Sequence, residues 1–179
     1  MKKSSILNFI SENPKRQICF LIFLSLALIV MTTIFYFSAQ TAEKSTKIES
    51  VVAEKQTEVL EKVLKNTNNV KRYAVVHWFE VWIRKIAHVL NYGALGFFLL
   101  GAFLNIDKIK KLYIKLLLPL GIGLIYGATD EIHQMFVRGR NASFSDIGID
   151  FLGVLIGTVF MLICYGIFKL FAKKRQKEV

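Results

Sequence analysis

The sequence predicts an all-α fold: a polytopic membrane bundle of four transmembrane helices, with one further amphipathic helix on the outer side of the membrane. Two observations lead to this prediction. The chain has 179 residues, of which 54% are hydrophobic, and its mean hydropathy is +0.44 although its formal net charge is +11. The charged residues are also segregated from long apolar runs, and a soluble core of this size has no room for such runs.

Four apolar segments are long enough to cross a bilayer. The first, 18–37, is a run of 20 residues without a charge, which matches a hydrocarbon layer of about 30 Å. It exceeds the apolar region of a signal peptide, so we expect an uncleaved anchor. Segments 83–104, 112–129 and 147–171 have the Leu, Ile, Phe and Gly content of membrane helices, and the third span should continue as a helix past residue 129.

A polar insert, residues 44–72, separates the first two spans. Thr46 and Glu49 have the spacing of a capping box, and valines and leucines recur after them at helical spacing. We therefore expect an amphipathic helix on the outer membrane surface or against the bundle. Trp78 and Trp82 are four residues apart and suit the headgroup level, which places the start of the second span at the outer interface.

Lysine and arginine flank the spans asymmetrically. The basic residues of these flanks are Lys2, Lys3, Lys15, Arg16, Lys108, Lys110, Lys111, Lys173, Lys174, Arg175 and Lys177. Because basic flanks stay in the cytoplasm, we expect a multi-pass protein of the cell membrane with both termini cytoplasmic. No repeat or linker divides the chain, so residues 1–179 should form a single domain. The basic residues are not interleaved with polar and aromatic ones, so we expect no nucleic-acid partner.

Polar side chains gather near the outer ends of the last three spans. The candidates for catalysis are His88, Asp130, His133 and Asp146. The candidates for substrate binding are Lys85, Tyr92, Glu131, Gln134, Arg138 and Arg140. A charge toward the bilayer centre costs about 2.5–3.5 kcal/mol. Asp150 and His88, which lie about a turn further inside, should therefore face the bundle interior.

Several of these residues also have purely structural interpretations. Asp146 can cap the fourth span, three residues after Ser143, and Lys85 can extend its amine to the headgroup level. Tyr92 can be an interfacial aromatic residue, and a single His88 is more often a packing residue than a catalyst. All these residues should lie at the same depth near the outer leaflet. Separate structural roles explain one residue at a time but do not explain why the whole group lies at one depth.

Glycines accompany the polar residues. Small residues spaced four apart occur at Gly123 and Gly127 and at Gly153 and Gly157, while Gly93 and Gly96 follow in the second span. Such spacing favours close helix packing. We expect these glycines to bring the last three spans near enough for their polar side chains to meet.

Three stretches resemble the VanZ-like family. They are residues 84–92 (RKIAHVLNY), residues 129–140 (TDEIHQMFVRGR) followed by Asp146, and residues 37–40 (FSAQ). The resemblance covers nearly the whole chain except the insert. It implies a small, multispanning protein of the bacterial envelope, whose namesake is associated with reduced susceptibility to the glycopeptide teicoplanin.

The sequence departs from the family pattern at two positions. Arg138 replaces the proline that is usual before Gly-Arg, which changes the stiffness and the charge of the loop. Asp150 stands where asparagine is usual, so no family role is carried over to this residue.

Two functions remain open. In the first, the protein is an enzyme that acts on a lipid-linked envelope substrate, with histidines that exchange protons, carboxylates that orient them and basic residues that clamp a phosphate. In the second, the same residues of a non-catalytic accessory protein recognise an anionic headgroup, a glycopeptide or a partner membrane protein. A self-neutralising polar core and a transporter are further alternatives, and four spans without inverted repeats argue against the transporter.

The expected partners are membrane lipid and a lipid-linked envelope precursor or glycopeptide. A zinc site would need His88 and His133 together with a carboxylate such as Asp130, and we assign no metal site. The cofactor, if the protein uses one, is unknown from the sequence.

Overall fold

The computed structural model describes residues 10–40, 69–138 and 144–177 of the chain. The helices are α2 (Pro14–Ser38), α4 (Asn69–Leu104), α5 (Leu112–Gln134) and α6 (Phe144–Lys177). Each contains a segment long and apolar enough to cross a membrane. These segments are Pro14–Ser38, Trp82–Leu104, Leu112–Gln134 and Ser145–Arg175. The predicted all-α class with four membrane-spanning helices is therefore confirmed.

Two of the helices are longer than the apolar segments that predicted them. α4 begins at Asn69, so Trp78 lies inside a continuous helix, while the membrane-spanning part, Trp82–Leu104, agrees with the predicted span 83–104. α6 likewise extends past the predicted 147–171 at both ends. Apolarity is required only within the bilayer, whereas helical hydrogen bonding continues into polar flanks. The amphipathic helix predicted over 44–72 lies outside the described residues, except that its last residues belong to α4.

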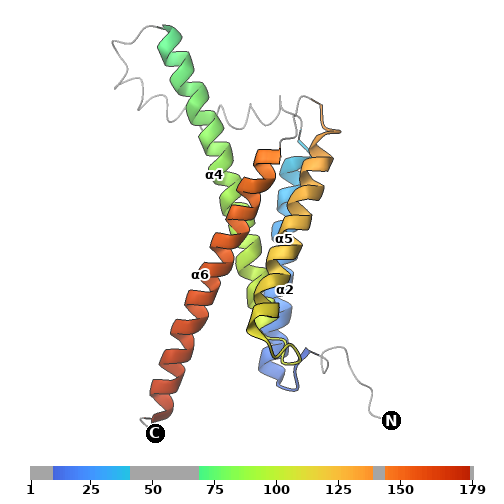
Figure 1. Cartoon of the computed structure of the whole chain (residues 1–179), viewed down its shortest axis with the longest axis vertical. Helices are drawn as coiled ribbons and strands as arrows, with labels where there is room; N and C mark the ends of the chain where they lie inside the picture. The colour runs from blue at the N-terminus through green and yellow to red at the C-terminus, as the bar shows by residue number, and fades with distance from the viewer. Residues whose placement is uncertain (1–9, 41–68, 139–143, 178–179) are drawn as a thin grey trace.

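α4 is the central helix of the bundle. It packs against α2, α5 and α6, and its contact with α6 is the most extensive in the structure. α4 and α6 cross and extend past their crossing in opposite directions (Figure 1). We call the end of the bundle where α5 ends and α6 begins the motif end. We call the opposite end, with the turn between α4 and α5, the basic end.

The crossing of α4 and α6 is close because glycines line both helices. A Cβ atom at Gly157 would overlap the carbonyl group of Gly93, and one at Gly153 would lie 2.7 Å from the Val89 carbonyl oxygen. A Cβ atom at Gly96 would also meet the α6 backbone. The two backbones therefore touch directly. This confirms the packing role predicted for the glycines of the second and fourth spans.

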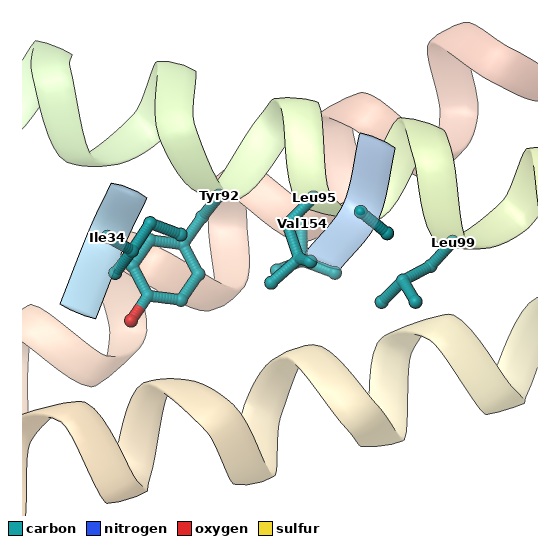
Figure 2. Packing of buried hydrophobic residues seen from close by; sticks show 6 residues of the cluster. Ile34, Tyr92, Leu95, Leu99 and Val154 are labelled. Carbon is teal, nitrogen blue, oxygen red and sulfur yellow. The ribbon is translucent and has the colours of Figure 1, made fainter. Parts of the chain in front are cut away.

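The apolar core lies between the helices. Ile34 of α2, Tyr92, Leu95 and Leu99 of α4 and Val154 of α6 are buried against one another (Figure 2). The opposite faces of the helices are apolar and exposed, including Leu28, Ile125, Phe160 and Phe168. Apolar side chains on both the inside and the outside are expected when the surrounding solvent is lipid.

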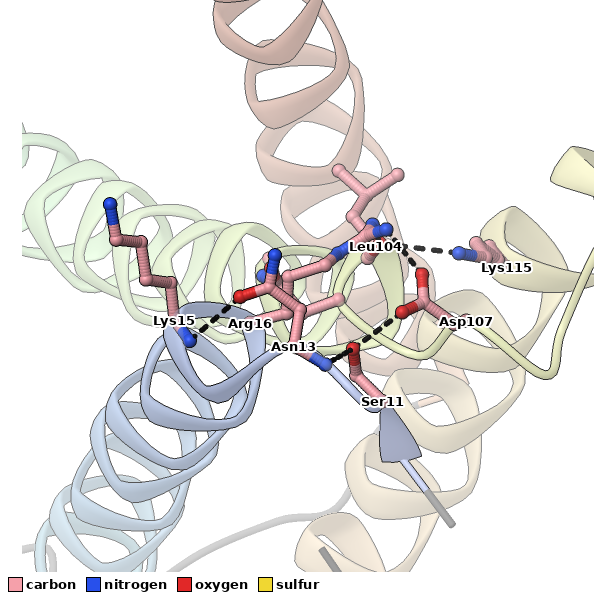
Figure 3. A network of polar contacts seen from close by, with 9 residues as sticks. Ser11, Asn13, Lys15, Arg16, Leu104, Asp107 and Lys115 are labelled. Atoms are coloured by element: carbon pink, nitrogen blue, oxygen red, sulfur yellow. Dashed lines mark hydrogen bonds and ion pairs between the residues drawn. The ribbon is translucent and has the colours of Figure 1, made fainter. Parts of the chain in front are cut away.

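A polar network closes the basic end (Figure 3). Asp107, in the turn between α4 and α5, accepts hydrogen bonds from the Ser11 hydroxyl and the Arg16 guanidinium. Arg16 also donates to the Leu104 carbonyl oxygen at 2.8 Å, and the Lys115 amine reaches the same oxygen at 3.2 Å. The Ser11 hydrogen bond, with help from Arg16, holds the pKa of Asp107 below its usual range. The network therefore ties the start of α2 to the α4–α5 turn.

Candidate functional site

A histidine and an aspartate meet inside the bundle at the motif end. His88 Nδ1 of α4 lies 3.0 Å from Asp150 Oδ1 of α6. The Asp150 side chain is 1% exposed, whereas the His88 side chain is 25% exposed. Both residues face the bundle interior, as their charge and depth predict. Gly153 lies one turn after Asp150 and touches the backbone of Val89, so the glycine crossing also brings this pair together.

Tyr92 lies one turn after His88 on the same face of α4. The two rings are nearly parallel, with centroids 6.3 Å apart and an interplanar angle of 11°. α5 packs against these residues of α4 and α6, because a Cβ atom at Gly127 would lie 3.5 Å from the Asp150 Cβ and 3.6 Å from the Tyr92 ring. Tyr92 is fully buried, and its hydroxyl faces the Asp130 side chain of α5, although no hydrogen bond of ordinary length joins the two groups.

The end of α5 contributes two more buried polar residues. Gln134 Nε2 donates to Asp130 Oδ2 at 3.0 Å. The charges of Asp130 and Asp150 both act on the Tyr92 hydroxyl. Asp130 Oδ1 and Asp150 Oδ2 are buried, and neither has a hydrogen-bond partner in the part of the chain that the structure describes. We call His88, Tyr92, Asp130, Gln134 and Asp150 the polar cluster.

The other acidic and histidine candidates lie around this cluster. The His133 ring stacks on Phe35 of α2, with centroids 4.8 Å apart. Glu131 is buried at the end of α5. Asp146 is partly exposed one turn before Asp150, near enough for its charge to act on that carboxyl group. His133 therefore packs on α2, while Asp146 borders the cluster.

The structure does not assemble the expected basic clamp from the residues it describes. The Lys85 amine lies 5.7 Å from the centroid of the Trp82 ring, and Arg138 is exposed beyond the end of α5. Among the described residues, no hydrogen bond or ion pair joins Lys85 or Arg138 to the polar cluster. Arg140 and the expected cap Ser143 lie outside the described residues.

A family model described as VanZ/LLP1 matches residues 23–167, which include the whole polar cluster. The chain belongs to the VanZ/LLP1 family. No curated protein and no solved structure matches the chain. Family membership and the four spanning helices together fit an integral membrane protein of the cell envelope.

Two features of this VanZ/LLP1 site were not among the candidates from the sequence. Asp150 was expected to face inward but was not chosen as a site residue, because it departs from the family pattern. Its spacing of four residues from Asp146, with Gly153 one turn further on, was the available signal. The second feature is Tyr126, whose hydroxyl donates to the Met31 carbonyl oxygen at 2.6 Å and so fixes α5 against α2.

Among the residues that the structure describes, His88 and His133 do not come together as the zinc site considered from the sequence would need. His88 contacts Asp150, whereas His133 packs on Phe35. Within the described ranges, no group of three or more His, Cys, Asp or Glu residues is arranged to hold a metal ion. The geometry of the cluster is instead that of a histidine oriented by a carboxylate.

Proposed function

We propose that this VanZ/LLP1 protein is an enzyme that cleaves or transfers a group of a lipid-linked substrate of the cell envelope by general acid–base catalysis and thereby lowers susceptibility to glycopeptides such as teicoplanin. His88 is the general acid or base, and Asp150 is the residue that positions it. The observation that carries the proposal is the 3.0 Å contact between His88 Nδ1 and Asp150 Oδ1 inside the bundle.

The contact assigns different roles to the two imidazole nitrogens. A carboxylate at Nδ1 favours the tautomer with its proton there, so Nε2 is the atom that exchanges a proton with substrate. The same carboxylate stabilises the imidazolium that forms when Nε2 takes up a proton. His88 is 25% exposed and Asp150 only 1% exposed, so substrate reaches the histidine and not the aspartate.

The unsatisfied polar atoms of the cluster argue against a core that merely neutralises itself. The Tyr92 hydroxyl, Asp130 Oδ1 and Asp150 Oδ2 are buried without a hydrogen-bond partner in the described part of the chain. Each such atom costs about 1–3 kcal/mol of desolvation. The Tyr92 hydroxyl and the Asp130 carboxylate face each other and need only a small shift to pair. Asp150 Oδ2 is therefore the atom that indicates a ligand, because an N–H or O–H group of a bound substrate can satisfy it.

The proposed site requires the motif end to face the outside of the cell, and labelling tests this orientation. Cys19 and Cys164 are free thiols and are first replaced by alanine. Single cysteines then replace Lys111, Asn141 and Gln176. Because basic flanks stay in the cytoplasm, only the cysteine at Asn141 should react with an impermeant thiol reagent in whole cells. Labelling of the cysteine at position 111 but not of the one at position 141 would show that the protein has the opposite orientation.

The proposed activity is tested with the intact protein in lipid vesicles. Purified protein should convert a lipid-linked peptidoglycan precursor into a product of different mass, detected by mass spectrometry. Expression in a susceptible strain should raise the teicoplanin concentration that inhibits growth. Asp107→Asn removes a carboxylate at the basic end and is the control for substitutions in the polar cluster. This variant should keep both the conversion of the precursor and the raised teicoplanin tolerance. Raised tolerance with the precursor bound but unchanged would instead favour a non-catalytic binding protein.

A further inference from the structure

Four basic side chains from four segments converge at the basic end. Tyr165, whose ring centroid lies 5.0 Å from the Lys169 amine, packs in the same apolar cluster as Leu116, the neighbour of Lys115. The charges of Arg16 on α2, Lys110 in the α4–α5 turn and Lys169 on α6 act on the Lys115 amine of α5. Arg16 and Lys115 share one acceptor, the Leu104 carbonyl oxygen at the end of α4. Figure 3 shows both side chains directed toward this oxygen.

The acidic groups near this cluster do not balance its charge. Asp107 is paired with Arg16 and accepts from the Ser11 hydroxyl, and its single negative charge also acts on Lys110 and Lys115, so one carboxylate faces a cluster of four basic side chains. Among the described residues, no carboxylate forms an ion pair with Lys110, Lys115 or Lys169. After the Arg16–Asp107 pair is set aside, three lysine charges remain close together. An added anion would relieve their mutual repulsion.

The depth of the lysines matches lipid phosphate. Lys115 lies in the first turn of α5, and His133 lies in the last turn of the same helix. These two residues are therefore about 27 Å apart along the helix axis, close to the thickness of the hydrocarbon layer. The Lys169 amine also lies 5.0 Å from the centroid of the Tyr165 ring, and tyrosine is typical of the membrane interface.

The surrounding surface suits acyl chains more than water. Leu112 beside the cluster is 50% exposed, and Phe168, next to Lys169, is 70% exposed. A soluble phosphate gains nothing from these side chains, whereas a phospholipid covers them with its chains while its phosphate meets the lysines.

We propose that Lys110, Lys115 and Lys169 form a binding site for the headgroup phosphate of an anionic phospholipid at the basic end. The site is distinct from the polar cluster and does not depend on the chemistry proposed there. Lipid bound here joins the α4–α5 turn, α5 and α6 through one phosphate.

The test is lipid retention by the purified protein, measured by native mass spectrometry with phosphatidylglycerol and phosphatidylcholine as probes. The wild type should retain one phosphatidylglycerol in preference to phosphatidylcholine. Removing one lysine charge near a phosphate should weaken binding about fivefold. We therefore expect about a fivefold loss for Lys169→Gln and about a 25-fold loss for Lys115→Gln with Lys169→Gln.

The matched control is Lys173→Gln with Arg175→Gln, which removes the same charge from exposed positions further along α6. The control should retain the lipid, and an equal loss in both double variants would overturn the proposal in favour of general attraction to a basic tail. Displacement of the lipid by millimolar inorganic phosphate would also overturn it. If the double variant is poorly folded, Lys169→Gln decides alone, since this side chain is exposed, and unchanged retention there refutes the site.

Discussion

The Gly157→Ala substitution is expected to destabilise the bundle so strongly that most of the protein no longer folds. A Cβ atom at this position would overlap the carbonyl group of Gly93, and both groups belong to helix backbones that cannot move aside alone. α4 and α6 would have to separate along their whole crossing. Overpacking of a well-packed interior typically lowers the free energy of unfolding by about 1–3 kcal/mol. We expect a loss of about 3 kcal/mol or more here, because the clash involves backbone atoms. Thermal unfolding in detergent measures this loss.

Gly166→Ala is the matched control for this substitution. It lies on the same helix, but a Cβ atom there would have nothing within 4 Å. Alanine is favoured over glycine by about 1 kcal/mol in a helix interior, so this variant should be as stable as the wild type or slightly more stable. Equal melting temperatures for the two variants would show that the helices do not cross as closely as described.

The second large effect is expected at the polar cluster. His88→Ala should reduce turnover of the lipid-linked precursor by about 10²- to 10⁴-fold, because general acid–base catalysis contributes rate factors of that size. Asp150→Asn should cause a smaller loss, since asparagine still accepts a hydrogen bond from Nδ1 but does not stabilise an imidazolium. The double variant should be no slower than His88→Ala, because the two residues act as one unit.

Membrane levels of each variant are measured alongside its turnover. Asp107→Asn, at the opposite end of the bundle, serves as the control for loss of a carboxylate. If His88→Ala keeps full turnover at wild-type abundance, the proposed role of His88 is wrong. If Asp150→Asn alone keeps full turnover, a neutral hydrogen-bond acceptor is sufficient to orient the histidine, and the proposed role of the Asp150 charge is wrong.

The fold could be predicted from the sequence because the signals for it are local. The length of each apolar run determines whether a helix can cross the bilayer, and the run 18–37 needs no partner to be recognised. The helical stretch 69–81 before the second span was not predicted, because Lys71, Arg72, His77 and Glu80 interrupt its apolar residues and no long apolar run marks it. Helix number therefore follows from hydropathy more securely than helix ends do.

The candidate site could be predicted only in part. The cost of a buried charge indicated that His88 and Asp150 face inward, because this argument needs only their depth. Their pairing depends on where α4 and α6 cross, and the distance between the two side chains cannot be predicted from a single sequence. The stacking of His133 on Phe35 depends in the same way on the position of α2, so helical register alone did not indicate this contact.

The glycine crossing has a genetic consequence. Gly153 both fits α6 against the backbone of Val89 and lies one turn from Asp150, so packing and chemistry depend on the same few positions. A screen for loss of the proposed glycopeptide tolerance should recover alleles of the glycines and of His88 with the same phenotype. Immunoblots of the membrane fraction would separate the two classes, and a suppressor of a glycine allele should arise in the facing helix.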